Sequence, residues 1–312
     1  MKKTRILRAL LSIIIVLSIL LDNGHCLAEK RNKGMILKKK PEYIFVGDTF
    51  KLSPKVKGEK VKFTYKSSNK KIATVNKKGK VKGKKKGKVK ITITADNGMK
   101  KVVKLEVKST DKLIMLTFDD GPGEHTERLL KAMKKNGYHG TFFMVGCQLT
   151  KRPAVAKKMV KNGNELGIHS WNHDAYAKLS TSAVEADVKR TRKLIKDCTG
   201  KKSVLVRPPY GSYNESTIQA LKNTGCACIM WNTDIEDYKF FDAGKVEHNI
   251  LTRVHPGAVL LVHDSHKWSV DAIISAMPKL KKQGYELVTV SEFARLKGLS
   301  LKPGQVIKGT SK

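Results

Sequence analysis

Short runs of alternating apolar and polar residues fill the chain from residue 34 to residue 108. The runs recur about every eight to twelve residues, are separated by turn residues, and carry no helical period. They cover residues 43–46, 61–65, 72–75, 89–94 and 102–107. This spacing predicts a small β-sandwich.

The pattern changes at Asp111, where apolar runs begin to alternate with segments of helical period. The strand candidates are 113–118, 141–145, 165–169, 204–207, 226–231, 258–262 and 287–290, and the helix candidates are 124–136, 153–162, 182–197, 215–224, 245–254 and 270–283. Strands alternating with helices over about 200 residues predict a parallel α/β barrel or a doubly wound sheet. Seven strand candidates favour a distorted, incomplete (β/α) barrel, followed by a C-terminal tail at 296–312.

The N-terminal residues have the pattern of a secretory signal peptide. Four basic residues precede an apolar run at 9–21, and Cys26-Leu27-Ala28 forms a small-x-small site. The run is shorter than the roughly 20 residues of a spanning helix, so we expect residues 1–28 to be cleaved and no stable transmembrane span. An uncleaved anchor remains the alternative.

Export would leave four cysteines, Cys147, Cys198, Cys226 and Cys228, in an oxidising compartment. Two disulfides among them could form in three ways, and the sequence does not choose. Cys226 and Cys228 would share one face of a strand, too far apart to bond each other. Four buried free thiols are the alternative.

Positive charge is concentrated in the first of the two regions. The chain has a net charge of +36, and residues 29–110 hold 27 Lys or Arg against 6 Asp or Glu. A cationic exported region suggests retention at the cell surface through anionic cell-wall polymers. Nucleic acid is disfavoured as a partner, because the few aromatic residues there fall in strand-like runs. Lysines that only solvate the outer faces of strands are the alternative.

Polar residues follow the strand candidates of the second region. Asp119 and Asp120 end the first one, His169 and His173 follow the third, and His263 ends a later one. In parallel α/β folds these carboxyl ends carry the catalytic residues. The histidines are four apart, so one helical turn would direct both imidazoles at one metal. With one carboxylate they would leave a coordination position open, as in catalytic zinc sites.

Residues 29–110 resemble the bacterial Ig-like group 2 domain. The resemblance rests on Tyr65-Lys66-Ser67-Ser68-Asn69, Ile72-Ala73-Thr74-Val75, Gly79-Lys80-Val81 and the run at 87–92. It implies an Ig-like sandwich that serves as a spacer or an adhesive module.

Residues 111–295 resemble the polysaccharide deacetylase family, the NodB-like enzymes of carbohydrate esterase family 4. Five motifs occur in order, at 117–122, 169–173, 207–210, 234–238 and 261–263. The resemblance implies a metal-dependent hydrolase that removes N-acetyl groups from N-acetylglucosamine residues of a polysaccharide.

The resemblance also implies a role for individual residues. Asp120, His169 and His173 would bind the divalent metal, most simply Zn²⁺, with Co²⁺ or Mn²⁺ as alternatives. Asp119 would be the general base, paired with Arg207. His263 would be the general acid, held by Asp237. Asp264 and His266, which follow the acid, are expected to face solvent.

The substrate is expected to lie among Tyr210, Trp171, Tyr238 and Leu261. The backbone N–H of Tyr210 would stabilise the oxyanion. Tyr238 departs from the tryptophan usual at its position, which leaves the shape of the acetyl pocket open.

Peptidoglycan is the first-choice substrate, because an exported enzyme with a surface module meets the wall first. Chitooligosaccharide N-deacetylation and acetylxylan O-deacetylation are alternatives within the family. A non-catalytic wall-binding adhesin is the alternative from another class. A metalloprotease is disfavoured, since the chain has no His-Glu-x-x-His.

Overall fold

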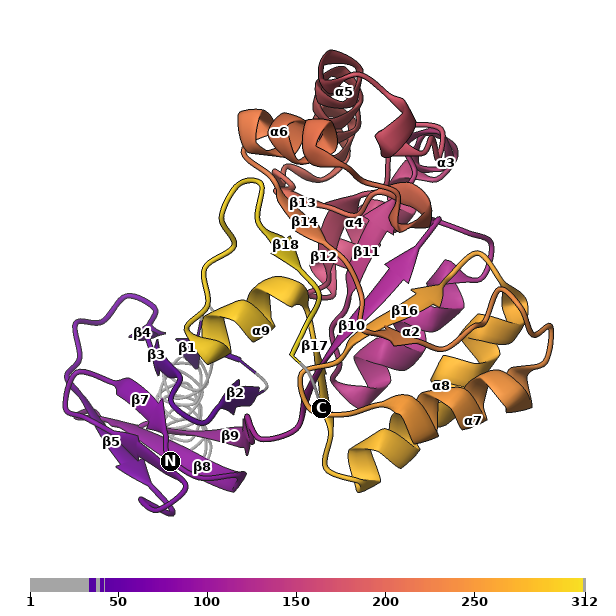
Figure 1. Cartoon of the computed structure of the whole chain (residues 1–312). Helices are drawn as coiled ribbons and strands as arrows, with labels where there is room; N and C mark the ends of the chain where they lie inside the picture. The colour runs from indigo at the N-terminus through magenta and orange to yellow at the C-terminus, as the bar shows by residue number, and fades with distance from the viewer. Residues whose placement is uncertain (1–33, 38–39, 42, 311–312) are drawn as a thin grey trace, which may run out of the picture. The chain divides into compact units, whose positions relative to one another are not determined.

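The computed structural model describes residues 34–37, 40–41 and 43–310 (Figure 1). The predicted signal peptide at 1–28 lies outside these residues. The chain divides into two compact units, Met1–Ser109 and Thr110–Lys312, and each is treated by itself. None of the helices in the described part of the chain is long and apolar enough to cross a membrane.

The first unit is built from short strands in three sheets. A four-stranded sheet has the order β2-β9-β8-β5, a three-stranded sheet β3-β7-β6, and β1 pairs with β4. The strands are β1 (Met35–Leu37), β2 (Tyr43–Phe45), β3 (Thr49–Lys51), β4 (Pro54–Val56), β5 (Phe63–Ser67), β6 (Ala73–Val75), β7 (Lys80–Gly83), β8 (Gly87–Ala95) and β9 (Lys100–Lys108). The predicted Ig-like sandwich is confirmed.

Apolar and polar residues alternate along the strands of this unit, and the apolar ones form its core. In β8, Val89, Ile91 and Ile93 are buried while Lys88 and Lys90 are exposed. Every second side chain of a strand points to the same face, so one face packs inward and the other is wet.

The second unit holds a curled sheet in which all strand pairs are parallel. Its order is β15-β16-β10-β11-β12-β13-β14-β18, and β17 also pairs with β10. The strands are β10 (Leu113–Asp119), β11 (Thr141–Met144), β12 (Glu165–Ile168), β13 (Leu205–Val206), β14 (Ala227–Ile229), β15 (Thr233–Asp234), β16 (Val259–His263), β17 (Glu286–Val288) and β18 (Val306–Ile307). The predicted incomplete, distorted barrel is confirmed.

Helices pack around this sheet (Figure 1). They are α2 (Thr126–Asn136), α3 (Gly146–Lys151), α4 (Pro153–Lys161), α5 (Thr181–Thr199), α6 (Glu215–Thr224), α7 (Ala243–Arg253), α8 (Lys267–Lys282) and α9 (Val290–Lys297), with 3₁₀ turns η1 (Tyr176–Lys178) and η2 (Pro209–Gly211). Ser180 caps α5 by accepting a hydrogen bond from the N–H of Ala183, and Gly200 ends it with a φ of 71°. All seven residues of β10 are buried, as expected for a central strand covered on both faces.

The C-terminal segment differs from the prediction. Residues 296–312 were expected to form a tail, but Val306 and Ile307 form β18 beside Cys228 and Ile229 of β14. The run is too short to show an alternating pattern, and it depends on the open edge of β14 for its hydrogen bonds.

The four described cysteines are free. Cys226 and Cys228 are buried, whereas Cys147 and Cys198 are partly exposed. The alternative prediction of four buried free thiols is therefore correct for two of the four cysteines and wrong in burial for the other two.

Candidate active site

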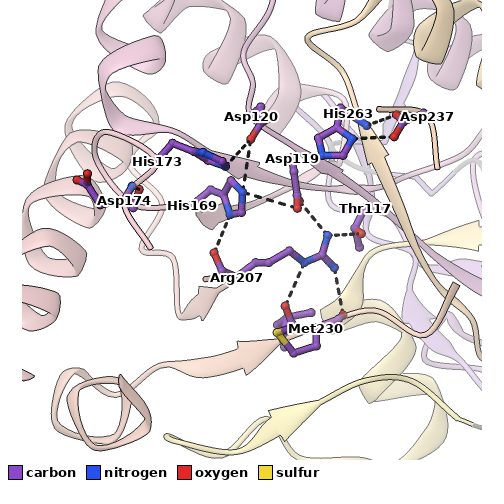
Figure 2. A network of polar contacts seen from close by, with 12 residues as sticks. Thr117, Asp119, Asp120, His169, His173, Asp174, Arg207, Met230, Asp237 and His263 are labelled. Atoms are coloured by element: carbon purple, nitrogen blue, oxygen red, sulfur yellow. Dashed lines mark hydrogen bonds and ion pairs between the residues drawn. The ribbon is translucent and has the colours of Figure 1, made fainter. Parts of the chain in front are cut away.

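Polar side chains from several strand ends converge at one edge of the curled sheet (Figure 2). Asp119, the last residue of β10, is the register partner of His263 at the end of β16. Ile168 of β12 pairs with Val206 of β13, which brings the following residues, His169 and Arg207, close together. Parallel pairing thus gathers residues that are far apart in the sequence.

Asp120, His169 and His173 form a cluster that could hold a metal ion. One ligand atom from each lies within 4.8 Å of the others. Asp120 Oδ1 is 3.4 Å from His169 Nε2 and 3.2 Å from His173 Nε2. One carboxylate and two imidazoles are a donor set that zinc and several other divalent metals accept.

The tautomer of His169 suits a metal ligand. Its Nδ1 lies 2.7 Å from the carbonyl oxygen of Arg207, which can only accept, so Nδ1 carries the proton. Burial lowers the pKa of His169 despite the nearby charges of Asp119 and Asp120. The neutral ring then directs the lone pair of Nε2 into the cluster, and the bond at Nδ1 fixes its orientation.

Asp120 completes the case that a cation fits this cluster. Burial would raise the pKa of Asp120, but His173, His169 and His263 together lower it to about 2. Its Oδ1 is buried and makes no well-aligned hydrogen bond to any described residue. A carboxylate oxygen that faces the lone pair of His169 Nε2 repels it unless a cation or a proton lies between them, and this cluster can hold such a cation.

Backbone strain is concentrated around the cluster. Asp120, His173 and Tyr210 have φ angles of 69°, 68° and 60°, which non-glycine residues rarely adopt. Each costs about 1–3 kcal/mol and persists only where the surrounding structure enforces it. The predicted helical turn from His169 to His173 is wrong, because this segment is a loop with Ser170 and His173 at positive φ.

Arg207 fixes the carboxylate of Asp119. Its Nη1 donates to Asp119 Oδ1 at 2.8 Å and to Thr117 Oγ1 at 2.8 Å. Nε and Nη2 donate to the carbonyl oxygens of Ile229 and Met230 at 3.0 and 3.2 Å (Figure 2). The guanidinium is completely buried, so every donor must find a partner. The other oxygen of Asp119, Oδ2, lies 3.8 Å from His169 Nε2 and faces the cluster.

Asp237 holds His263 from two sides. Its Oδ1 is 2.8 Å from His263 Nδ1, and its Oδ2 accepts from the backbone N–H of His263 at 2.8 Å. Burial would lower the pKa of His263, but Asp237, Asp119 and Asp120 outweigh it and raise the pKa to about 9. His263 is therefore protonated at neutral pH.

Two of the predicted substrate-binding residues are exposed beside these groups. The ring of Tyr210 lies 4.5 Å from that of His173, and its side chain is 71% exposed. The ring of Tyr238 lies 6.0 Å from that of His263, and its hydroxyl donates to Asp234 Oδ2 at 3.1 Å. Tyrosine at this position thus keeps an aromatic ring near the predicted acid and anchors it by a hydrogen bond.

The other two predicted substrate-binding residues lie in packed positions. Leu261 is buried in β16 and pairs with Thr117 and Asp234. The guanidinium of Arg190 lies 3.5 Å from the ring centroid of Trp171. Their contact with substrate stays a prediction.

Asp264 was expected to face solvent, and this expectation is wrong. Its side chain is completely buried, Thr126 donates a hydrogen bond to its Oδ2, and Thr126 accepts one from the N–H of Gly123. Burial raises the pKa of Asp264 to about 7. A Cβ on Gly121 would lie 2.3 Å from Asp264 Oδ1, so this carboxyl group packs directly under the loop after Asp120. Asp264 comes soon after the apolar run 259–262, which is buried in β16, and this position in the sequence could have indicated that its side chain is buried.

Thr117 and His266 also differ from the sequence interpretation. Thr117 was quoted only as part of a motif, but its hydroxyl links Arg207 to the carbonyl oxygen of Leu260 at 2.6 Å. His266 is partly buried, and its ring stacks on that of Trp268 at 4.6 Å.

Comparison with known proteins identifies both units. A family model described as polysaccharide deacetylase matches residues 106–229, and one described as bacterial Ig-like domain (group 2) matches residues 34–105. Peptidoglycan-N-acetylglucosamine deacetylase PgdA of Listeria monocytogenes is 36% identical over 216 residues, covering 67% of this chain and 46% of that relative. The chain thus spans less than half the length of that relative.

Other relatives are covered more fully. A peptidoglycan-N-acetylglucosamine deacetylase of Bacillus cereus is 31% identical over 198 residues, covering 62% of this chain and 92% of the relative. The solved structure of T48 deacetylase with substrate is 34% identical with a TM-score of 0.60, covering 64% of this chain and 98% of the other.

Two further solved structures show the range of proteins with this fold. A family 4 acetyl xylan esterase from Clostridium thermocellum, in complex with a cobalt ion, is 26% identical with a TM-score of 0.60, covering 64% of this chain and 100% of the other. A CE4 family pseudoenzyme from Bacillus anthracis is 28% identical with a TM-score of 0.56, covering 59% and 65%. Both resemblances predicted from the sequence are confirmed, and the chain belongs to the polysaccharide deacetylase family.

Proposed function

We propose that this protein is a metal-dependent hydrolase that removes N-acetyl groups from N-acetylglucosamine residues of a cell-surface polysaccharide. The observation that carries the proposal is the meeting of three groups at one sheet edge. These are the cluster of Asp120, His169 and His173, the pair of Asp119 and Arg207, and the pair of His263 and Asp237.

Each group has a step in the hydrolysis. A divalent cation bound by Asp120, His169 and His173 would supply Lewis acidity, polarising the acetyl carbonyl and acidifying water. Asp119 Oδ2 takes the proton of the attacking water, while Arg207 holds the carboxylate in place. The backbone N–H of Tyr210 donates to the oxyanion of the tetrahedral intermediate.

His263 completes the reaction as the general acid. Its Nδ1 is bound to Asp237, so its Nε2 carries the proton that passes to the leaving amine nitrogen as the C–N bond breaks. An amide needs this proton because an amine anion is a very poor leaving group. A raised pKa keeps the proton available at neutral pH.

Peptidoglycan is the proposed substrate. The relatives from Listeria monocytogenes and Bacillus cereus carry names of peptidoglycan-N-acetylglucosamine deacetylases. Chitooligosaccharide is the alternative amide substrate. Acetylxylan is the alternative ester substrate, supported by the structural likeness to an acetyl xylan esterase.

We also propose that the protein is secreted and retained at the cell surface through its first unit. The support is the predicted signal peptide at 1–28 and the composition of residues 29–110, which contain 27 basic residues and 6 acidic ones. Anionic wall polymers are the proposed partners of this unit. A non-catalytic wall-binding adhesin is the alternative, since a pseudoenzyme shares the fold.

The test is acetate release by the purified protein from N-acetylglucosamine oligomers, isolated peptidoglycan and acetylxylan. Each reaction is run with zinc, cobalt, manganese or a chelator. We expect metal-dependent release from peptidoglycan. Release from acetylxylan alone would favour the ester alternative, and no release from any substrate by metal-loaded protein would favour the adhesin.

A further inference from the structure

Exposed aromatic rings gather in the loops beside the candidate site. Among the described residues, the exposed large hydrophobic side chains include three aromatic ones, Tyr210, Tyr238 and Phe241. Tyr210 follows β13, and Tyr238 and Phe241 follow β15, so all three lie beyond strands of the sheet that carries the site. Phe241 is 76% exposed, the largest fraction among them. Aromatic side chains left in water next to a polar site indicate a binding surface.

Phe241, Trp268 and His266 together form what we name the aromatic platform. The ring of Phe241 meets that of Trp268 edge-on, with centroids 4.8 Å apart and planes at 69°. The ring of His266 stacks on Trp268 at 4.6 Å with planes at 9°. The rings come from two segments, the loop before α7 and the start of α8. Contact between the rings restricts their motion, which lowers the entropy cost of binding a ligand.

The platform is attached to the pair that forms the predicted acid. Trp268 Nε1 donates to the carbonyl oxygen of Asp237 at 2.7 Å. The ring of His266 lies 5.9 Å from that of His263. At the other end of the site, Tyr210 contacts His173. The exposed rings therefore flank the site from the metal cluster to the acid.

Charge around the platform argues against a polyanion as its ligand. Two lysines of the segments that carry it are in ion pairs, Lys239 with Glu236 at 2.8 Å and Lys267 with Asp271 at 2.7 Å. Both ammonium groups are thus partly neutralised. The surface consists mainly of aromatic ring faces and edges, and these can pack against the apolar C–H faces of an uncharged pyranose ring.

We propose that the aromatic platform binds a sugar unit of the polysaccharide, one that neighbours the unit being deacetylated on the His263 side. This subsite rests on the proposed function and deepens it. It would favour chains of two or more units over a single sugar, because a single sugar that fills the reacting position leaves the platform empty. The ligand class is a hexopyranose of a β-linked chain, bound through the apolar C–H face of its ring.

Phe241 is the residue to change, because its side chain makes no hydrogen bonds and can bind a sugar only by packing against it. Trp268 is a poor choice, since its removal would also release the carbonyl of Asp237. The full-length variant Phe241→Ala is compared with Phe241→Tyr, which restores a ring. Leu299→Ala is the matched control, because Leu299 is also an exposed apolar residue of the second unit, with 54% exposure.

The measurements are kcat and KM for acetate release from N-acetylglucosamine itself and from its hexasaccharide. We expect Phe241→Ala to lower kcat/KM for the hexasaccharide by about tenfold, mainly through KM, with a smaller loss for the single sugar. Phe241→Tyr should recover most of the loss, and Leu299→Ala should match wild type. Equal losses for both substrates, or no loss for the hexasaccharide, would overturn the subsite.

Binding separates this subsite from the proposed function. Quenching of tryptophan fluorescence by N-acetylglucosamine and by its hexasaccharide is followed with wild type and Phe241→Ala. If wild type releases no acetate but binds the hexasaccharide more tightly than Phe241→Ala does, the subsite stands and the deacetylase proposal falls. If wild type binds neither sugar, the subsite is overturned as well.

Discussion

Asp119 and Arg207 form a completely enclosed ion pair whose second carboxylate oxygen remains free for chemistry. Two charges removed from water are tolerated only when they are well hydrogen-bonded, and the guanidinium of Arg207 donates to four acceptors. Such a pair helps to position a base, because the bond from Arg207 holds Oδ1 while Oδ2 faces the metal cluster.

Asp119→Asn tests the base directly. The amide keeps the shape and an oxygen for Arg207 but cannot take a proton, so we expect acetate release to fall by about 10²–10⁴-fold. Metal content, measured by elemental analysis, should stay near the wild-type value because the cluster residues are unchanged. Appreciable turnover by the metal-loaded variant would remove Asp119 from the base role.

His169→Ala tests the metal cluster. The loss of one of three ligands should reduce metal affinity by more than the roughly 10–100-fold typical of residues that only orient ligands. Metal content and rate should fall together. His248→Ala, which removes an exposed histidine of α7, is the control and should change neither. A fully metallated, active His169→Ala protein would contradict the assignment.

Asp237→Asn tests whether Asp237 is the cause of the raised pKa of His263. His263 donates a proton, so activity should be lost as pH rises through its pKa, which lies at about 9 in the folded protein. Without the charge of Asp237, burial would dominate and the pKa would fall. The alkaline limb of the kcat profile should therefore move to lower pH. An unchanged limb in the profile of the variant would assign it to another group.

At the scale of elements, the longer helices and the buried strands followed from the sequence. The 19 residues of α5 carry an apolar stripe with a serine cap and a terminal glycine, and all three features can be read locally. The two-residue strands β15 and β18, and the six residues of α3, were not predicted. So few residues show no period, and their hydrogen bonds depend on neighbours distant in sequence.

The candidate site shows the same division. Its residues could be predicted through the resemblance to the polysaccharide deacetylase family, because all five motifs occur in order at strand ends. Its backbone conformation was not, because positive φ at Asp120, His173 and Tyr210 is imposed by surrounding packing against local preference. The burial of Asp264 likewise depends on the loop that packs over it.

The four-stranded sheet of the first unit contains an unfavourable pair. Lys90 of β8 and Lys104 of β9 are register partners, and both are exposed on the outer face. Like charges directly opposite are destabilising, so Lys104→Glu should raise the free energy of unfolding by about 0.2–1 kcal/mol. The measurement is urea unfolding at low salt. Lys57→Glu, at an exposed turn, makes the same charge change and should have a smaller effect; equal effects would refute the cross-strand explanation.

At the scale of the whole molecule, chemistry and charge are divided between the two units. Deleting residues 29–109 should preserve hydrolysis of short soluble oligomers, because every residue of the candidate site lies after Thr110. It should weaken sedimentation with isolated cell walls at low salt. High salt should weaken wild-type binding similarly, since ions screen exposed charges. Unchanged wall binding by the deletion variant would locate retention in the second unit.

The last strand of the sheet has a consequence for the order in which the site matures. β18 pairs with β14, and the carbonyls of Ile229 and Met230 at the end of β14 hold the guanidinium that orients Asp119. The N–H of Met230 also donates to the carbonyl of Ile307 at 2.7 Å. Residues 306–307 are synthesised after every other strand of the sheet. A chain that has not yet placed β18 would carry all the catalytic residues yet lack this support, so we expect activity only after the final strand has docked.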